Sequence, residues 1–299
     1  MRDATLKKIP VPFWVLLAVA FLIAAGACRG RDSQPSGEEV RVSSSTAYEK
    51  HFGSPPTAEK GRCYALVGYL PTRDEPARVR PFPLFLFTDQ NQISLLVERL
   101  LEENGSNLDR LGLTNPFPRG TFLKGLHRDG GAVTLHLGNA GDAPQVRLGK
   151  GALEALGHSL LQFPGVARVD VHFAGRKAGR FPPSPEGNET LSVLPPEDPL
   201  LLGAVGFWES EQRGAEEVAL HFDRPVRVEQ LKVEDAETGE VLTGEYFQSI
   251  FNMAVIIHPE KPGSIQEGMP LKIYWQVSDG KDRMGTGSEI ITLGRGERP

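Results

Sequence analysis

The 299-residue sequence predicts an α+β fold, in which a two-helix, mixed-sheet α/β sandwich is followed by an all-β sandwich. Three observations lead to this class. Two segments with a helical hydrophobic period alternate with short strand-like segments up to residue 178. Beyond residue 200, short strands follow one another with turns about every 8–15 residues. Between these parts, residues 179–199 are rich in proline, which breaks regular elements and predicts a linker.

The N-terminus has the pattern of an export signal. Three basic residues lie within the first eight positions, and an uncharged run of 17 residues, Val11 to Ala27, follows them. This run ends in small residues, which is typical of a signal peptide. The next residue, Cys28, completes a resemblance to a bacterial lipobox, which implies cleavage after residue 27 and lipid attachment to Cys28. An uncleaved membrane anchor and a plain secretory signal are the alternatives.

Residues 28–60 are predicted to form a flexible tether. Ser, Gly, Glu and Pro dominate this segment, and it has no sustained apolar period. Such a composition buries too little apolar surface to fold. The second cysteine, Cys63, follows in an apolar stretch and is expected to be a small buried hydrophobe.

Residues 61–178 predict the order β-β-α-β-β-α-β. In the first helix, Ile93, Leu96, Val97, Leu100 and Leu101 recur at helical spacing, and Asn104–Gly105 ends it. The second helix begins near residue 151 and ends at residue 164. Five strands are expected, at residues 62–70, 79–88, 121–127, 133–138 and 166–173.

Two short motifs in this part resemble a known family. The segment Leu160–Val169 ends a helix and opens a strand, because proline cannot continue the helix and glycine accommodates a sharp reversal. It resembles the signature of the GerMN domain, the sporulation and spore germination domain, and Pro118–Thr121 resembles the element before that family's central hairpin. The resemblance implies a GerMN-like domain at 61–178. It also implies a structural role, not a catalytic one, for the motif residues Gln162, Phe163, Pro164, Gly165, Val166, Pro118, Gly120 and Thr121.

Residues 200–299 predict a second domain, an all-β sandwich. The segments Phe222–Val226 and Leu271–Asp282 resemble those of bacterial Ig-like domains, which commonly follow GerMN domains. Strands are expected at residues 218–222, 228–233, 241–242, 253–257, 271–277 and 290–293.

The sequence contains no recognisable catalytic or metal-binding cluster. Gly157–Leu161 begins like a nucleophile elbow but lacks its final glycine, and it lies within a predicted helix. None of the seven histidines forms an H-x-x-x-H pair. Asp279 and Asp282 supply too few carboxylates for a calcium loop, so a hairpin turn is favoured there. We therefore expect no catalytic residue, no metal, no cofactor and no enzymatic activity.

Charge and aromatic residues give few further clues. The formal net charge of −5 argues against nucleic-acid binding. The aromatic pair Phe207–Trp208 is expected in the sandwich core, in preference to a carbohydrate platform. Side chains of two histidines and four basic residues are expected to face solvent: His136, His172, Arg168, Arg176, Lys177 and Arg180.

These observations favour a lipid-anchored lipoprotein on the extracytoplasmic face of the bacterial cell membrane. The resemblance implies a non-catalytic assembly or interaction module in spore formation, germination or cell-envelope complexes. Expected partners are envelope or sporulation proteins, copies of the chain itself in oligomers or rings, and peptidoglycan. A peptidoglycan-binding accessory protein is the alternative function, and a cell-wall hydrolase ranks last because the sequence offers no catalytic cluster.

Overall fold

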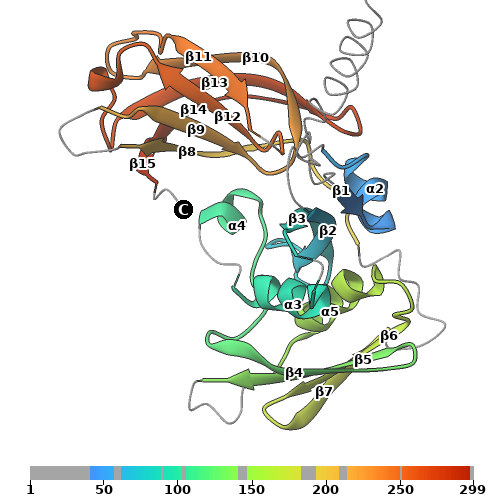
Figure 1. Cartoon of the computed structure of the whole chain (residues 1–299). Coiled ribbons are helices and arrows are strands. Elements are labelled where there is room, and N and C mark those ends of the chain that lie inside the picture. The colour runs from blue at the N-terminus through green and yellow to red at the C-terminus, as the bar shows by residue number, and fades with distance from the viewer. Residues whose placement is uncertain are drawn as a thin grey trace, which may run out of the picture. The chain divides into compact units, whose positions relative to one another are not determined.

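The computed structural model describes residues 41–56, 62–88, 90–102, 106–140, 147–182, 193–208, 214–249 and 251–296, within a compact unit spanning Val40–Pro299. The predicted α+β class is confirmed: helices pack with mixed sheets in the first half, and the second half is a β-sandwich (Figure 1). The predicted signal peptide, with Cys28 after it, lies outside the described residues. None of the described helices is both long and apolar enough to span a membrane.

Part of the predicted tether is folded, which corrects that prediction. Strand β1 (Arg41–Ser44) runs parallel to β2 (Arg62–Pro71), and helix α2 (Thr46–Phe52) follows it. The Ser45 side chain caps α2 by accepting a hydrogen bond from the backbone N–H of Tyr48. Tyr48 and Phe52, four residues apart, are both buried. These two aromatic residues lie on one helix face and supply the apolar surface that holds this segment in place. The composition of the segment as a whole is polar, so it does not indicate this surface.

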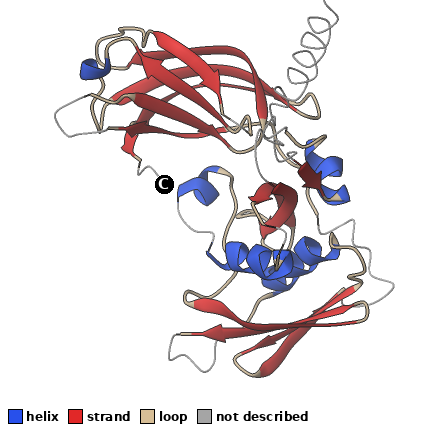
Figure 2. Cartoon of the chain, in the orientation of Figure 1, coloured by secondary structure: helices blue, strands red, loops and turns tan. Residues whose placement is uncertain are grey.

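The first half of the unit has two sheets with helices between them. The inner sheet has the order β1-β2-β3, with β3 at Val79–Leu86. The outer sheet has the order β4-β5-β6-β7, and only its β5–β6 pair is parallel. Helix α5 packs on β2, β6 and β7, and α3 packs on β2, β3 and β4, so both helices lie between the sheets (Figure 2). The remaining elements are α3 (Gln92–Glu102), α4 (Ser106–Arg110), β4 (Thr121–Asp129), β5 (Ala132–Asn139), α5 (Lys150–Leu161), β6 (Arg168–Phe173) and β7 (Arg176–Phe181).

Strand β7 overlaps the start of the segment predicted as a linker, residues 179–199. Its pattern is hard to recognise because only Phe181 is a large apolar residue, yet that side chain is buried in the core. Farther along, Val193 bridges to Val79 of β3, and the Leu194 N–H donates to the Val79 carbonyl at 2.7 Å. Residues 193–194 of the predicted linker therefore attach to the inner sheet, while residues 183–192 lie outside the described residues.

The second half is a sandwich of a three-stranded and a five-stranded sheet. Their orders are β10-β13-β14 and β11-β12-β9-β8-β15, and Phe222, Trp275 and many aliphatic side chains fill the space between them. The sequence pattern missed β8, β11 and β15, and residues 241–242 form only a bridge from Val241 to Glu234. The strands are β8 (Leu201–Phe207), β9 (Glu217–Phe222), β10 (Val226–Asp235), β11 (Gly244–Gln248), β12 (Ala254–Pro259), β13 (Pro270–Asp279), β14 (Met284–Thr292) and β15 (Gly294–Arg295).

Helix α2 contacts the turn between β13 and β14. The Phe52 ring lies 5.6 Å from the Arg224 guanidinium carbon and 5.9 Å from that of Arg283. Next to it, a Cβ atom on Gly53 would lie 2.3 Å from the carbonyl oxygen of Gly280, so the two backbones touch. The segment predicted as a tether therefore joins the two halves.

Candidate functional site

The motif residue Gln162 lies directly after α5 and joins that helix to the inner sheet. Its side-chain oxygen accepts hydrogen bonds from the Val67 N–H at 3.0 Å and the Ser45 hydroxyl at 2.7 Å. Its amide donates to the carbonyls of Val67 at 2.7 Å and Ser159 at 2.6 Å. One side chain therefore satisfies both backbone groups of a fully buried strand residue.

Helix α5 thereby completes the edge of β2 where β1 ends. The β1–β2 pairing ends at Ser44 and Ala65, and the Ser45 N–H still donates to the Ala65 carbonyl. Beyond this point Gln162 pairs with Val67, and the Ser159 hydroxyl accepts from the Tyr69 N–H at 3.0 Å. In sequence, Ser159 belongs to the segment that begins like a nucleophile elbow. In the structure it is buried, and its hydroxyl pairs with the backbone at the edge of β2.

The other motif residues shape two turns at opposite ends of β4. At the end of α5, the Val166 N–H donates to the Phe163 carbonyl, and Gly165 takes a φ of +77°. The Arg128 guanidinium, near the end of β4, donates to the Pro164 carbonyl at 2.6 Å. The structure places these residues at a helix-to-strand corner.

The second motif element precedes β4. The backbone N–H and hydroxyl of Thr121 both donate to the Pro118 carbonyl, and Gly120 has a φ of +81°. Positive φ favours glycine, so this turn requires the residue type found there. The two motif elements are not brought together into one site.

Groups with catalytic potential are engaged in structural roles. Cys63 is buried, and burial raises the pKa of its thiol to about 11, which keeps it protonated at neutral pH. His158 contacts buried Glu154 at 3.3 Å between Nε2 and Oε2. Among the described residues, no group of three or more His, Cys, Asp or Glu side chains is arranged to hold a metal ion.

Asp279, considered in the sequence for a calcium loop, lies in a buried ion-pair network. Its carboxylate accepts hydrogen bonds from the guanidinium groups of Arg224 and Arg283 and from the backbone N–H groups of Lys281 and Arg283. Burial alone would raise its pKa, but the hydrogen bonds from Arg283 and the backbone outweigh burial and lower it. The carboxylate is therefore already neutralised by the protein.

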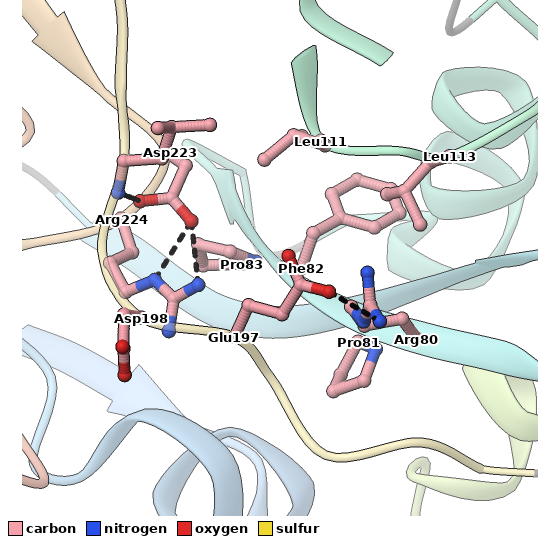
Figure 3. Close-up of a pocket in the computed structure, with 11 residues that line it drawn as sticks. Arg80, Pro81, Phe82, Pro83, Leu111, Leu113, Glu197, Asp198, Asp223 and Arg224 are labelled. Carbon is pink, nitrogen blue, oxygen red and sulfur yellow. Dashed lines mark hydrogen bonds and ion pairs between the residues drawn. The ribbon is translucent and has the colours of Figure 1, made fainter. Parts of the chain in front are cut away.

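A small pocket next to this network is lined by residues of both halves (Figure 3). Its charged groups point at one another: Arg80 pairs with Glu197 at 2.6 Å, and Arg224 donates two hydrogen bonds to Asp223. Its volume of about 30 Å³ holds little more than water. Since these charged groups are already paired within the protein, we assign them a structural role and not ligand binding.

The outer face of the sheet β4-β5-β6-β7 gathers basic and aromatic side chains. His136 and His172 lie on neighbouring strands with ring centres 4.9 Å apart, and His136 is exposed. Asp170 accepts hydrogen bonds from Arg180 at 2.7 Å and from Arg168 at 2.9 Å. Burial acts to raise the pKa of Asp170, but these two guanidinium groups outweigh it and lower the pKa.

The same face also carries an exposed aromatic ring. Phe122 is 47% exposed and covers Gly138 of the neighbouring strand. Lys177, exposed on β7, pairs in register with His172. This surface therefore combines cationic, imidazole and aromatic side chains.

The aromatic pair of the sandwich is half-buried. Trp208 packs against the sandwich core, and the guanidinium carbon of Arg295 lies 5.3 Å from the centre of its ring. Phe207 is also only partly exposed. Contacts within the sandwich therefore cover much of the surface that a stacked sugar would need.

Comparison with known proteins gives one family match. Residues 67–179 match the family model Germane, described as sporulation and spore germination. No curated protein sequence is significantly similar to the chain.

Three solved structures show partial similarity. The tandem GerMN domains of the sporulation protein GerM from Bacillus subtilis are 16% identical, with a TM-score of 0.29; the match covers 38% of this chain and 40% of that chain. CopC from Methylosinus trichosporium OB3b is 15% identical, with a TM-score of 0.23, over 34% of this chain and 98% of that chain. PcoC, a copper resistance protein from Escherichia coli, is 12% identical, with a TM-score of 0.23; the match covers 31% of this chain and 98% of that chain.

Proposed function

We propose that the chain is a non-catalytic assembly or interaction module in spore formation, germination or cell-envelope complexes, because residues 67–179 match a sporulation and spore germination family model. The observation that carries this proposal is the family match, whose description names sporulation and spore germination. The fold itself would serve many functions, so the proposal rests on the family and not on the architecture.

The outer face of the sheet β4-β5-β6-β7 supports an interaction role. Its helices pack on one side, whereas His136, Lys177 and Phe122 are exposed on the other. Aromatic and arginine side chains are common at the centres of protein interfaces. We propose that this face contacts an envelope or sporulation protein, or a second copy of the chain within an oligomer or ring.

We also propose that the N-terminal segment anchors the chain to the outer side of the cell membrane through a lipid on Cys28. The basic start, the uncharged run and the small residues before the cysteine support this proposal. Treatment with globomycin, or the Cys28→Ser substitution, should change processing and release the chain from membranes. Unchanged processing and membrane retention would contradict lipid attachment.

A gene deletion with complementation tests the interaction role. Deletion should impair engulfment, the yield of heat-resistant spores or germination, and the native gene should restore them. The double variant Phe122→Ser/Lys177→Glu should fail to restore them, because both changes lie on the exposed outer face. Normal values of all three measures after deletion would refute a role in sporulation.

A matched control is available on the sandwich. Ile290 is 63% exposed on β14 and pairs in register with Lys272 of β13. The double variant Ile290→Ser/Lys272→Glu also replaces one apolar side chain by serine and reverses one charge, but on another surface, and it should restore function. Failure of both double variants would point to a general loss of solubility and not to loss of one contact face.

The alternative function is peptidoglycan binding. Retention of the purified chain on peptidoglycan, abolished by an aromatic-to-alanine change at Trp208, would favour it. The contact between Trp208 and Arg295 argues against that ring as a free platform. A hydrolase is the remaining alternative, and release of soluble fragments from peptidoglycan would support it.

A further inference from the structure

An open pocket of about 540 Å³ lies where α2, β2 and α5 meet the β13–β14 turn and residues 193–196. Its volume falls within the roughly 300–1,000 Å³ typical of small-molecule sites. None of the described residues that line it carries a carboxylate. Both halves of the compact unit contribute side chains, so the pocket depends on their contact.

Three cationic side chains converge on this pocket. Lys50 comes from α2, and Lys281 and Arg283 come from the turn after β13. Lys50 and Lys281 are exposed, and among the described residues neither forms an ion pair with a carboxylate. Arg283 is held in place by Asp279 and by the carbonyl of His51, to which it donates at 2.7 Å.

The acidic residues adjacent to the two lysines in sequence have other partners: Glu49, next to Lys50, accepts a hydrogen bond from the Ser44 hydroxyl, and Asp282, next to Lys281, contacts Arg227 at 3.7 Å. Asp279 is buried and already shared by Arg224 and Arg283, and Glu154 is buried against His158. The lining of the pocket therefore carries three cationic side chains and no carboxylate, in a chain whose formal net charge is −5.

His51, one of the two histidines that line the pocket, responds to this charge. The Tyr69 hydroxyl lies 3.2 Å from His51 Nε2. Burial first, and then the charges of Lys50, Arg283 and Lys281, lower the pKa of His51 to about 4. A negative group in the pocket would offset those charges and raise that pKa again.

We infer that this pocket binds a small anion that carries a phosphate or carboxylate group. The two lysines and Arg283 supply donors for an oxyanion, and Arg283 is preorganised for it. Leu194, Pro195 and Pro196 provide an apolar wall for the rest of the ligand. This inference goes beyond the proposed interaction role and does not depend on it.

Isothermal titration calorimetry of the full chain at low ionic strength tests the inference, with glycerol 3-phosphate and N-acetylmuramic acid as separate probes. We expect saturable binding of at least one probe, and which one binds identifies phosphate or carboxylate as the recognised group. The double variant Lys50→Gln/Lys281→Gln should bind about tenfold more weakly, which corresponds to about 1.4 kcal/mol. Both lysines are exposed, so the fold should persist, and circular dichroism would verify this.

Lys124→Gln is the matched control, because Lys124 is exposed on β4 and does not line the pocket. It should leave affinity unchanged. NMR of ¹³C-labelled histidine supplies a second readout, since saturation with the bound probe should raise the pKa of His51. The inference is overturned by the absence of saturable binding of either probe, by equal weakening in the control, or by binding that leaves the pKa of His51 unchanged.

Discussion

Replacing Gln162 by alanine should destabilise the chain far more than its partly exposed position suggests. The substitution removes four hydrogen bonds and leaves the N–H and carbonyl of Val67 unpaired. Val67 is fully buried, so water cannot replace the lost partner. An unpaired buried backbone group costs about 1–3 kcal/mol. Two such groups lose their partner and partly buried Ser45 can turn to water, so we expect a total loss of about 2–6 kcal/mol.

Urea unfolding of the full chain, followed by circular dichroism, measures this loss. The matched control is Gln248→Ala, since the Gln248 side chain donates one hydrogen bond, to the Val226 carbonyl at 2.9 Å. That control should cost about 0.5–1.5 kcal/mol. If Gln162→Ala destabilises the chain no more than the control does, side-chain completion of the β2 edge is not an important source of stability.

A conservative variant distinguishes the role of the Gln162 side-chain oxygen, an acceptor, from that of its NH₂ group, a donor. Gln162→Glu keeps an acceptor for the Val67 N–H but turns a carboxylate oxygen toward the carbonyls of Val67 and Ser159. At pH 7 this variant should therefore be less stable than the native chain. Acidification should reduce the difference, because a protonated carboxyl regains a donor. A difference that does not change with pH would contradict the assigned hydrogen bonds.

Further predictions address the junction of the two halves and two buried groups. Gly280→Ala places a Cβ atom 2.4 Å from the Phe52 carbonyl oxygen and should cost about 1–3 kcal/mol in urea unfolding, whereas Gly263→Ala, with open space around it, should change stability little. Phe52→Ala removes a buried ring and should cost about 3–5 kcal/mol; a loss below 1 kcal/mol would show that the ring does not hold the halves together. Because the pKa of His51 is lowered in the folded chain, acidification protonates this side chain first in the unfolded chain. The free energy of unfolding should therefore fall between pH 6.5 and about 4, by up to about 2 kcal/mol after allowance for solvent screening. The variant His51→Gln should lack this pH dependence. In a Cys28→Ser chain, Cys63 should react with iodoacetamide at pH 8 only after unfolding, because burial raises its pKa to about 11; rapid reaction of this folded variant would contradict the burial of Cys63.

The strongly periodic segments of this chain could be predicted from sequence. The spacing of Leu96, Val97 and Leu100 predicted helix α3, whose buried side chains include these three. The alternation of Val169, Val171 and Phe173 likewise matches strand β6, where all three are buried. In both elements, one face is covered by the same core, so hydrophobic period and burial coincide.

Elements held by few apolar side chains were missed. Helix α2 depends on Tyr48 and Phe52 within a polar segment, and β7 depends mainly on Phe181. Their stability comes from tertiary contacts that no local window contains. The basic pocket was missed for the same reason, because Lys50 and Lys281 are far apart in sequence and meet only through those contacts.

The hydrogen bonds of Gln162 to β2 could not be predicted from the sequence either. Its place before Pro164 and Gly165 indicates a helix-to-strand corner, but nothing in that spacing reveals a partner near residue 67. A polar side chain with four hydrogen bonds looks, in sequence, like any surface glutamine.

The inner sheet offers little room for an added strand. On one side, β1 and the side chains of Gln162 and Ser159 take up backbone groups of β2, and on the other side Val193 pairs with Val79 of β3. Exposed strand edges are where sheets of separate molecules join. If copies of the chain associate by strand pairing through the outer sheet, β4 and β7 are the edges of that sheet. Any growing assembly would then extend the sheet that carries the basic, histidine-bearing face, and repeat that face along its length.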